Sequence, residues 1–177
     1  MIARYGYKPV FQYKFRPFAQ EGALPSDGGF TVLFYENGIL SFSTYDAHGA
    51  FLDELCFALP GRVMQFFYGL LRNAGSWLPF TPPRLQGQEK SAYGSSFAFD
   101  GYDPIQIFGM NALICEPCGS PAGFFARHMY VLFEDVSNLF ADCGIHLTLD
   151  GFSWDSEKVR PFRKNQLYSS APQRGVV

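Results

Sequence analysis

Two cysteines separated by two residues form the pattern in this chain that is most typical of metal or redox chemistry. The segment Cys115-Glu116-Pro117-Cys118 has the spacing at which two thiolates bind zinc. A tetrahedral site needs two further ligands, but His128 and Cys143 lie fifteen residues apart on one predicted helix, a separation of about 22 Å. Cys56 or His146 would then have to complete the site. We therefore predict no bound metal and keep the cysteine pair as a weak candidate.

The same pair could take part in thiol–disulfide exchange. That role favours a pair at the start of a helix that follows a strand, where the helix N-terminus lowers the thiol pKa. Here Pro121 begins the predicted helix three residues after Cys118, so the pattern matches only in part. Two ordinary loop cysteines are the simpler interpretation.

Carboxylates gather near a histidine in a second segment. Asp53 and Glu54 follow the stretch Asp46-Ala47-His48-Gly49, and carboxylates beside an imidazole can do acid–base chemistry. The stretch is also typical of a polar turn, in which Asp and Gly satisfy the backbone. Asp100 and Asp103 flank another turn, but without the spacing and closing Glu of an EF-hand. The predicted binding residues are Tyr45, Asp46, His48, Asp53, Glu54, Asp100, Tyr102 and Asp103.

Common catalytic motifs are absent from the sequence. It contains no Gly-x-Ser-x-Gly elbow, no P-loop and no dinucleotide-binding glycine pattern. Two of the three histidines, His128 and His146, lie on predicted elements with apolar neighbours, where a histidine is usually structural. We therefore predict no catalytic residues and no cofactor, and the sequence favours a protein that is not an enzyme.

The formal net charge of −2 hides an uneven distribution. Residues 1–16 carry +4 and residues 155–177 carry +3, whereas residues 17–154 carry −9. An acidic body complements a basic partner surface, and such complementarity speeds and orients encounter. The alternative is that the acidic residues only keep the body in solution. Basic and aromatic residues at the two ends could contact nucleic acid, but a pI near 5.9 argues against this as the main activity.

Large apolar groups are unusually frequent in the chain. Aromatic residues make up 18% of it and charged residues 17%, against about 25% charged in an average protein. This balance favours an exposed apolar patch, and such patches mark interaction sites. The alternative is a core built from Phe instead of Leu.

Alternation of apolar and polar residues predicts most of the strands. Residues 11–16 alternate without a break, so one face of this strand should be buried and the other wet. Residues 30–36 and 39–45 flank Asn37-Gly38, a strong hairpin signal. Residues 51–59 follow as a third strand of the meander. Further strands are predicted at 93–100, 105–108 and 145–149.

Helical spacing of apolar residues predicts two helices. The first begins after Pro60 and continues through residue 73, and the second spans about 122–143 between Pro121 and Gly144. The predicted apolar stripe of the first helix is Val63, Phe66, Phe67, Leu70 and Leu71. That of the second is Phe125, Met129, Leu132, Val136, Leu139, Phe140 and Cys143. The sequence therefore predicts an α+β fold: a mainly antiparallel sheet, made of a meander plus a hairpin, with two helices packed on one face.

We expect a single domain over residues 1–154 and a polar, basic, mobile tail over residues 155–177. No apolar run approaches the roughly 18 residues that a membrane span needs, and the N-terminus has no signal-peptide pattern. We therefore predict a cytoplasmic protein whose four cysteines are reduced.

In composition the chain resembles small, aromatic-rich α+β proteins without catalytic motifs, among them bacterial immunity proteins and phage-encoded inhibitors of defence nucleases of the anti-CRISPR kind. No shared motif carries this resemblance, so it implies a function by analogy alone. The implied function is a protein-binding inhibitor that blocks a larger partner, for example at a basic nucleic-acid-binding surface, and that could itself form oligomers. The alternative is an enzyme or a small-molecule-binding protein with a pocket between the sheet and the helices. Acidic residues gathered on one face would favour the inhibitor.

Overall fold

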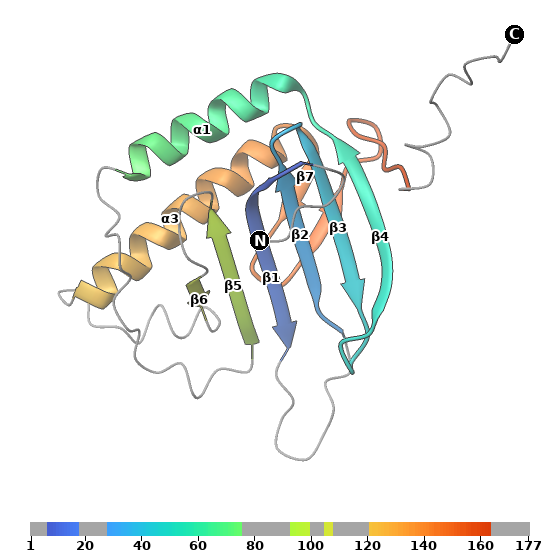
Figure 1. Ribbon diagram of the computed structural model, residues 1–177, viewed down its shortest axis with the longest axis horizontal. Coiled ribbons are helices and arrows are strands. Elements are labelled where there is room, and N and C mark those ends of the chain that lie inside the picture. Colours follow the sequence, from blue (N-terminus) through green and yellow to red (C-terminus); the bar gives the residue numbers. More distant parts are fainter. Residues whose placement is uncertain (1–6, 18–27, 76–92, 100–104, 108–120, 164–177) are drawn as a thin grey trace, which may run out of the picture.

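The structure, a computed structural model, describes residues 7–17, 28–75, 93–99, 105–107 and 121–163. A six-stranded antiparallel sheet forms one layer, and two helices with a short hairpin lie against it (Figure 1). The elements are β1 (Pro9–Pro17), β2 (Phe30–Tyr35), β3 (Ile39–Tyr45), β4 (Phe51–Ala58), α1 (Gly61–Gly75), β5 (Tyr93–Phe99), β6 (Ile105–Ile107), α3 (Pro121–Ala141), β7 (Ile145–Leu147) and β8 (Phe152–Trp154). This arrangement confirms the predicted α+β fold with a mainly antiparallel sheet.

The strand order in the sheet is β4-β3-β2-β1-β5-β6, so β1 lies inside the sheet although it comes first in the chain. It pairs with β2 on one side and with β5 on the other. The segments β2, β3 and β4 form the predicted meander, and β5 with β6 forms the predicted hairpin. β4 is therefore the strand at one edge of this sheet.

The β2–β3 turn contains the predicted Asn37-Gly38 pair. Gly38 has a φ of +81°, and its N–H donates to the Tyr35 carbonyl at 2.9 Å. Glycine suits this position because a side chain is strained at positive φ. The turn residues thus fix the register that places the buried faces of β2 and β3 together.

Both helices pack on the same face of the sheet. In Figure 1, α3 and β7 lie behind the sheet and α1 runs along the upper end of its strands. Phe67 of α1 and Phe140 of α3 each meet Phe11 and Phe34 edge-on, with ring centroids 5.2–6.4 Å apart. These contacts join both helices to the centre of the sheet, as the sequence predicted.

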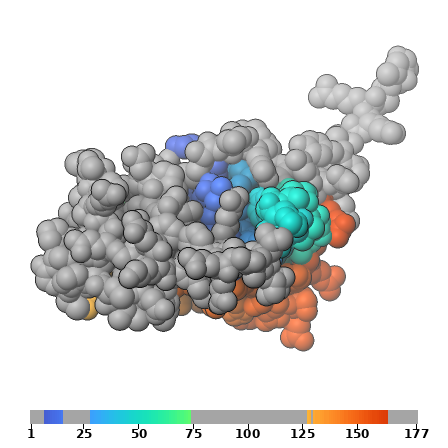
Figure 2. Space-filling model, turned by 90° about the horizontal axis from the view of Figure 1, so that it is seen from below, coloured from blue at the N-terminus to red at the C-terminus, as the bar shows by residue number. Residues whose placement is uncertain are grey.

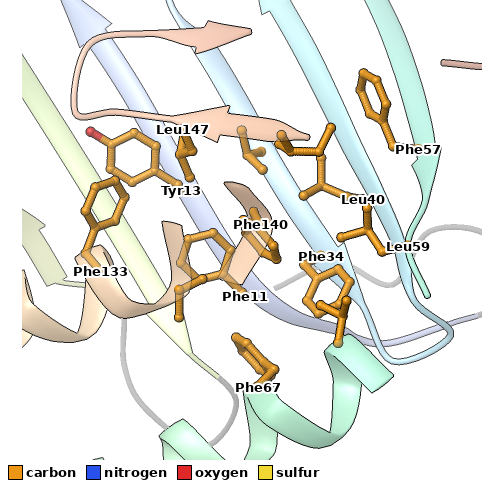
Figure 3. Close-up of a cluster of buried hydrophobic side chains, with 14 of the residues drawn as sticks. Phe11, Tyr13, Phe34, Leu40, Phe57, Leu59, Phe67, Phe133, Phe140 and Leu147 are labelled. Carbon is orange, nitrogen blue, oxygen red and sulfur yellow. The ribbon is translucent and has the colours of Figure 1, made fainter. Parts of the chain in front are cut away.

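Aromatic rings dominate the core (Figure 3). Phe11, Tyr13 and Phe34 are fully buried, and Phe133 of α3 packs on Tyr13 with centroids 4.8 Å apart. The Tyr13 hydroxyl donates to the Leu149 carbonyl at 2.5 Å, which satisfies its polar atom and ties the β7–β8 turn to β1. The excess of Phe in the sequence is therefore used in large part to build this core.

The other face of the sheet differs between its strands. Lys14 of β1 is exposed, as predicted for the wet face of that strand. All six residues of β2 are buried, and Ser41 and Ser43 of β3 are 0% and 1% exposed. Side chains alternate along a strand, so these two serines belong to the face opposite the helices. The sheet is thus buried on both faces at β2 and β3.

One residue of the predicted apolar stripe of α1 is exposed and does not join the core. Phe66 is 62% exposed, whereas its neighbour Phe67 is 0% exposed. Successive helical residues point about 100° apart, and the buried stripe is centred on Val63, Phe67 and Leu70. Phe66 falls at the margin of that stripe, so its assignment to the core was wrong.

The chain beyond residue 154 continues to pack against the body. We name residues 155–163, which the sequence analysis assigned to the tail, the strap. Val159 of the strap is only 9% exposed and joins the core, and the Asp155 N–H donates to the Gly144 carbonyl at 2.8 Å. Strand β8, which the sequence analysis did not predict, leads into it. Residues 164–177 lie outside the described residues.

Candidate functional site

Five of the eight predicted binding residues lie together where β3 passes into β4. These five are Tyr45, Asp46, His48, Asp53 and Glu54. The other three, Asp100, Tyr102 and Asp103, fall outside the described residues, as do the weak metal candidates Cys115 and Cys118. The β3–β4 end is therefore the region in which the structure can place the predicted site.

Asp46 holds the β3–β4 turn in shape. Its carboxylate accepts the backbone N–H of His48 at 2.9 Å and that of Ala50 at 2.7 Å. Its backbone carbonyl accepts the N–H of Gly49, whose φ is +82°. These bonds are those of the polar turn that the sequence offered as the alternative to acid–base chemistry.

The segment before β2 packs closely on this turn. The Tyr45 N–H donates to the Gly29 carbonyl at 2.9 Å. A Cβ atom on Gly28 would lie 1.5 Å from the Tyr45 carbonyl oxygen, so only glycine permits this approach. The end of β3 is thus fixed from outside the hairpin as well as by the turn itself.

Asp53 links β4 to the strap. Its Oδ1 accepts the Glu54 N–H at 2.9 Å, and its Oδ2 accepts the Arg163 guanidinium at 3.0 Å. Both side chains of this ion pair are largely exposed, at 48% for Asp53 and 69% for Arg163. The Glu54 carboxylate accepts the Ser43 hydroxyl at 3.4 Å. The carboxylates of β4 are therefore held in position by neighbouring groups.

The strap closes part of the β4 edge. The Cys56 N–H donates to the Phe162 carbonyl and the Phe162 N–H donates to the Cys56 carbonyl, both at 2.9 Å. Such a mutual pair is one rung of an antiparallel ladder. The strap therefore satisfies the edge of β4 at Cys56, near the C-terminal end of the strand.

Two adjacent apolar side chains are exposed at the other end of β4. Phe51 is 57% exposed and Leu52 is 62% exposed, although the Tyr45 ring meets Phe51 edge-on at 6.2 Å. Figure 2 looks onto this end of the sheet, where the teal residues of the β3–β4 segment reach the surface. We name the group formed by Tyr45, Asp46, His48, Phe51, Leu52, Asp53 and Glu54 the β3–β4 patch.

The sequence analysis missed Phe51 and Leu52 as site residues. A signal for them was present, because two consecutive apolar residues break the period of two expected for a half-buried strand. The structure shows the cause: Thr44 pairs with Asp53 but Tyr45 pairs with Phe51, so Leu52 is the extra residue of a β-bulge. A bulge on an edge strand re-aims side chains.

The described acidic residues do not gather on one element. Asp46, Asp53 and Glu54 lie in the β3–β4 patch. A second group lies on α3 and the hairpin and strap that follow it, and consists of Glu134, Asp135, Asp142, Asp150, Asp155 and Glu157. No Lys or Arg occurs between residues 129 and 157. Charge alone thus leaves two candidate docking faces, and only in the patch are two adjacent large apolar side chains both exposed among the described residues.

The described residues provide no set of ligands that would support the metal hypothesis. Among them, no group of three or more His, Cys, Asp or Glu side chains is placed to hold an ion. Burial raises the pKa of the Cys143 thiol, opposed in part by Arg62. A raised pKa disfavours the thiolate that binds zinc.

Burial and a hydrogen bond to Glu134 also raise the pKa of the Tyr130 phenol on α3.

The predicted pocket between sheet and helices falls where the aromatic core lies. In the described part of the chain this space is filled by rings such as Phe11, Phe67 and Phe140, which meet edge-on (Figure 3). Phe42 and Phe152 stack with centroids 4.1 Å apart where the β7–β8 hairpin covers the sheet. The small-molecule hypothesis therefore has no support from these contacts and stays a prediction.

No protein-family model matches the chain, and no curated protein matches it in sequence. Among the helices that the structure describes, none is both long and apolar enough to cross a membrane.

Proposed function

We propose that this protein is a protein-binding inhibitor that docks through the β3–β4 patch onto a basic surface of a larger partner. The observation that carries the proposal is the adjacent exposure of Phe51 and Leu52, each more than half exposed, between the carboxylates of Asp46 and Asp53. Interfaces commonly join an apolar centre to a polar rim, and aromatic residues are frequent among their energetic anchors.

The carboxylates around this apolar pair select the kind of partner. Asp46, Asp53 and Glu54 bring three acidic side chains to one end of the sheet. A basic groove that binds nucleic acid would complement them, and the apolar pair would displace water at the centre of the contact. We therefore propose a nucleic-acid-processing enzyme as the partner, such as a defence nuclease, blocked because its groove is occupied.

The patch is also suited to binding because it is built on a constrained turn. Asp46 fixes the turn through two backbone amides, and Gly28 packs directly on the Tyr45 backbone. A surface that is held before binding loses less conformational entropy on association. This supports a recognition role for the patch in preference to a purely structural one.

The test uses the purified protein as bait in a lysate of the cells in which it occurs, followed by reconstitution with the captured protein. The double variant Phe51→Ser/Leu52→Ser should reduce the affinity for the partner by about a hundredfold or more, since hot-spot losses commonly exceed 2 kcal/mol. The matched control is Phe66→Ser, which removes an equally exposed ring from α1. It should bind as tightly as the wild type.

Two results would overturn the proposal. One is equal loss of binding in the double variant and the control, which would mean that the patch has no special role. The other is a captured protein that keeps its full nucleic-acid-processing activity when saturated with the inhibitor. Competition by a short duplex DNA is the expected result, because duplex and patch would occupy the same basic groove.

A further inference from the structure

The helix α1 carries only basic charge, although the body of the protein is acidic. It contains Arg62 and Arg72 and no Asp or Glu. Both arginines are exposed, and neither forms an ion pair among the residues that the structure describes. Residues 17–154 as a whole carry −9, so this face differs in charge from its surroundings. Such guanidinium groups are available to an anionic ligand.

Each of these arginines has an exposed aromatic residue about one helical turn away. Phe66 follows Arg62 by four residues, and Arg72 follows Tyr68 by four residues. Residues with this spacing are neighbours on a helix surface. Phe66 is 62% exposed and Tyr68 is 37% exposed. α1 therefore presents two pairs at its surface, each made of an aromatic ring and a guanidinium group.

A glycine lies between the two pairs. Gly69 comes three residues after Phe66 and three residues before Arg72. Glycine in a helix interior destabilises the helix relative to alanine. A Cβ atom on Gly69 would meet nothing within 4 Å, so packing does not require glycine at this position. Glycine also occurs where a ligand approaches the backbone closely, and the open space at Gly69 is thus a second sign of a binding face.

The core contacts of α1 argue against a lipid surface as the ligand. Val63, Phe67 and Leu70 pack into or against the core, and Figure 3 shows the Phe67 ring there. A helix that binds a membrane buries its apolar stripe in the lipid. This stripe is already buried in the protein, and the surface of the helix keeps a mixed face of rings and guanidinium groups.

Single-stranded nucleic acid offers a partner to both kinds of group. Its phosphates are anionic, and its bases can stack on aromatic rings. Arg62 and Arg72 are about 15 Å apart along the helix axis, so a strand that follows the axis would meet both guanidinium groups. An acidic peptide would pair with the arginines but would leave the rings without a stacking partner.

We propose that the outward face of α1 binds single-stranded nucleic acid. The residues of this face are Arg62, Phe66, Tyr68, Gly69 and Arg72. The arginines bind phosphates, the rings stack on bases, and the space at Gly69 lets the strand approach the helix. The contact does not rest on the proposed function, because the β3–β4 turn lies at the opposite end of the sheet from α1 (Figure 1).

The test measures the fluorescence anisotropy of a labelled thymidine oligonucleotide of about 12 nucleotides, titrated with the full chain at low salt. Phe66→Ser should weaken binding by about tenfold, because it removes a ring on which a base stacks. The reciprocal control is Phe51→Ser/Leu52→Ser, which removes exposed apolar groups at the other end of the sheet. It should bind the oligonucleotide as tightly as the wild type.

The salt dependence of binding reports the number of phosphate contacts. For a single strand, each neutralised phosphate adds about 0.7 to the steepness with which log affinity falls against log salt concentration. Arg72→Gln should therefore reduce this steepness by about 0.7. The matched control Arg160→Gln removes an exposed arginine from the strap and should leave it unchanged. An equal reduction in both variants would overturn the proposal, because net charge alone would then attract the strand.

Gly69→Ala separates binding from stability. Its methyl group should raise the midpoint of thermal unfolding by about 2–4 °C, because alanine favours a helix. The same group should weaken oligonucleotide binding by about fivefold, because it fills space that the strand would occupy. Gly61→Ala places a methyl group in open space at the first residue of α1 and should leave binding unchanged. A stabilised Gly69→Ala variant with wild-type affinity would contradict the proposed face.

Three other results would also overturn the proposal. The first is no binding of the oligonucleotide at low salt. The second is equal affinity for a duplex of the same length, whose bases are not open to stacking. The third is self-association of the wild type that Phe66→Ser abolishes, because a second copy would then occupy α1. None of these results bears on the β3–β4 patch, which is tested by capture of a protein partner.

Discussion

Each half of β4 carries one phenylalanine, and the two rings differ sharply in exposure. Phe57 is 0% exposed, whereas Phe51, six residues earlier on the same strand, is 57% exposed. Phe57 packs on Phe152 and Trp154 of the β7–β8 hairpin, with centroids 5.8 Å and 5.5 Å away. The strap pairs with Cys56 beside it.

The difference follows from the elements that reach each half of the strand. The β7–β8 hairpin and the strap reach the C-terminal half of β4, while the N-terminal half follows directly from the β3–β4 turn (Figure 1). We therefore expect the buried Phe57 to contribute to stability, whereas the exposed Phe51 belongs to the surface for which we propose a role in recognition. Three sets of substitutions test this division.

The largest contrast is expected between Phe57→Ala and Phe51→Ala. Truncating the buried ring should lower the free energy of unfolding by about 3–5 kcal/mol, since it removes buried area and leaves a cavity. Truncating the exposed ring should change it by no more than about 0.5 kcal/mol. Denaturant unfolding of both variants measures the contrast. Equal losses would mean that both halves belong to the core.

A smaller effect is expected for Asp46→Ala in the turn. The substitution removes the acceptor for the backbone amides of His48 and Ala50 and should lower the free energy of unfolding by about 1–2 kcal/mol. Asp46→Asn keeps an acceptor oxygen and should restore most of this stability. If Asp46→Ala and Asp46→Asn have the same free energy of unfolding, the turn does not depend on that acceptor oxygen.

The smallest effect is expected for Arg163→Ala at the end of the strap. The Arg163–Asp53 ion pair is solvent-exposed, so its removal should cost at most about 1 kcal/mol, and the cost should shrink in high salt. Unfolding at low and high ionic strength provides the measurement. A loss above about 2 kcal/mol that ignores salt would show that Arg163 holds the strap by packing rather than by charge.

Local patterns in the sequence predicted much of the fold. Three of these patterns extend over only a few residues, so they can be recognised without a structure. They are the Asn37-Gly38 turn, the alternation of residues 11–16 and the helix stop at Gly144. They predicted the meander, both helices and the antiparallel sheet. They failed at Phe66, because a helical stripe has margins whose burial depends on the neighbouring element.

The candidate site was predicted only in part. Asp46, Asp53 and Glu54 were found as a carboxylate group, but the apolar pair between them was read as ordinary strand. The bulge that turns Leu52 outward depends on how β3 and β4 align. Nor could the sequence reveal that Arg163 reaches Asp53 across a separation of 110 residues.

The sequence by itself determined both helices and most of the strands, though not β8, because turn chemistry and periodicity are local properties of the chain. Only the tertiary structure decided that β1 enters the sheet between β2 and β5, that Ser41 and Ser43 are buried, and that the strap closes one half of β4. Burial depends on which distant elements come to lie against a residue. Of two phenylalanines on one strand, one can therefore be buried in the core while the other is exposed at the surface.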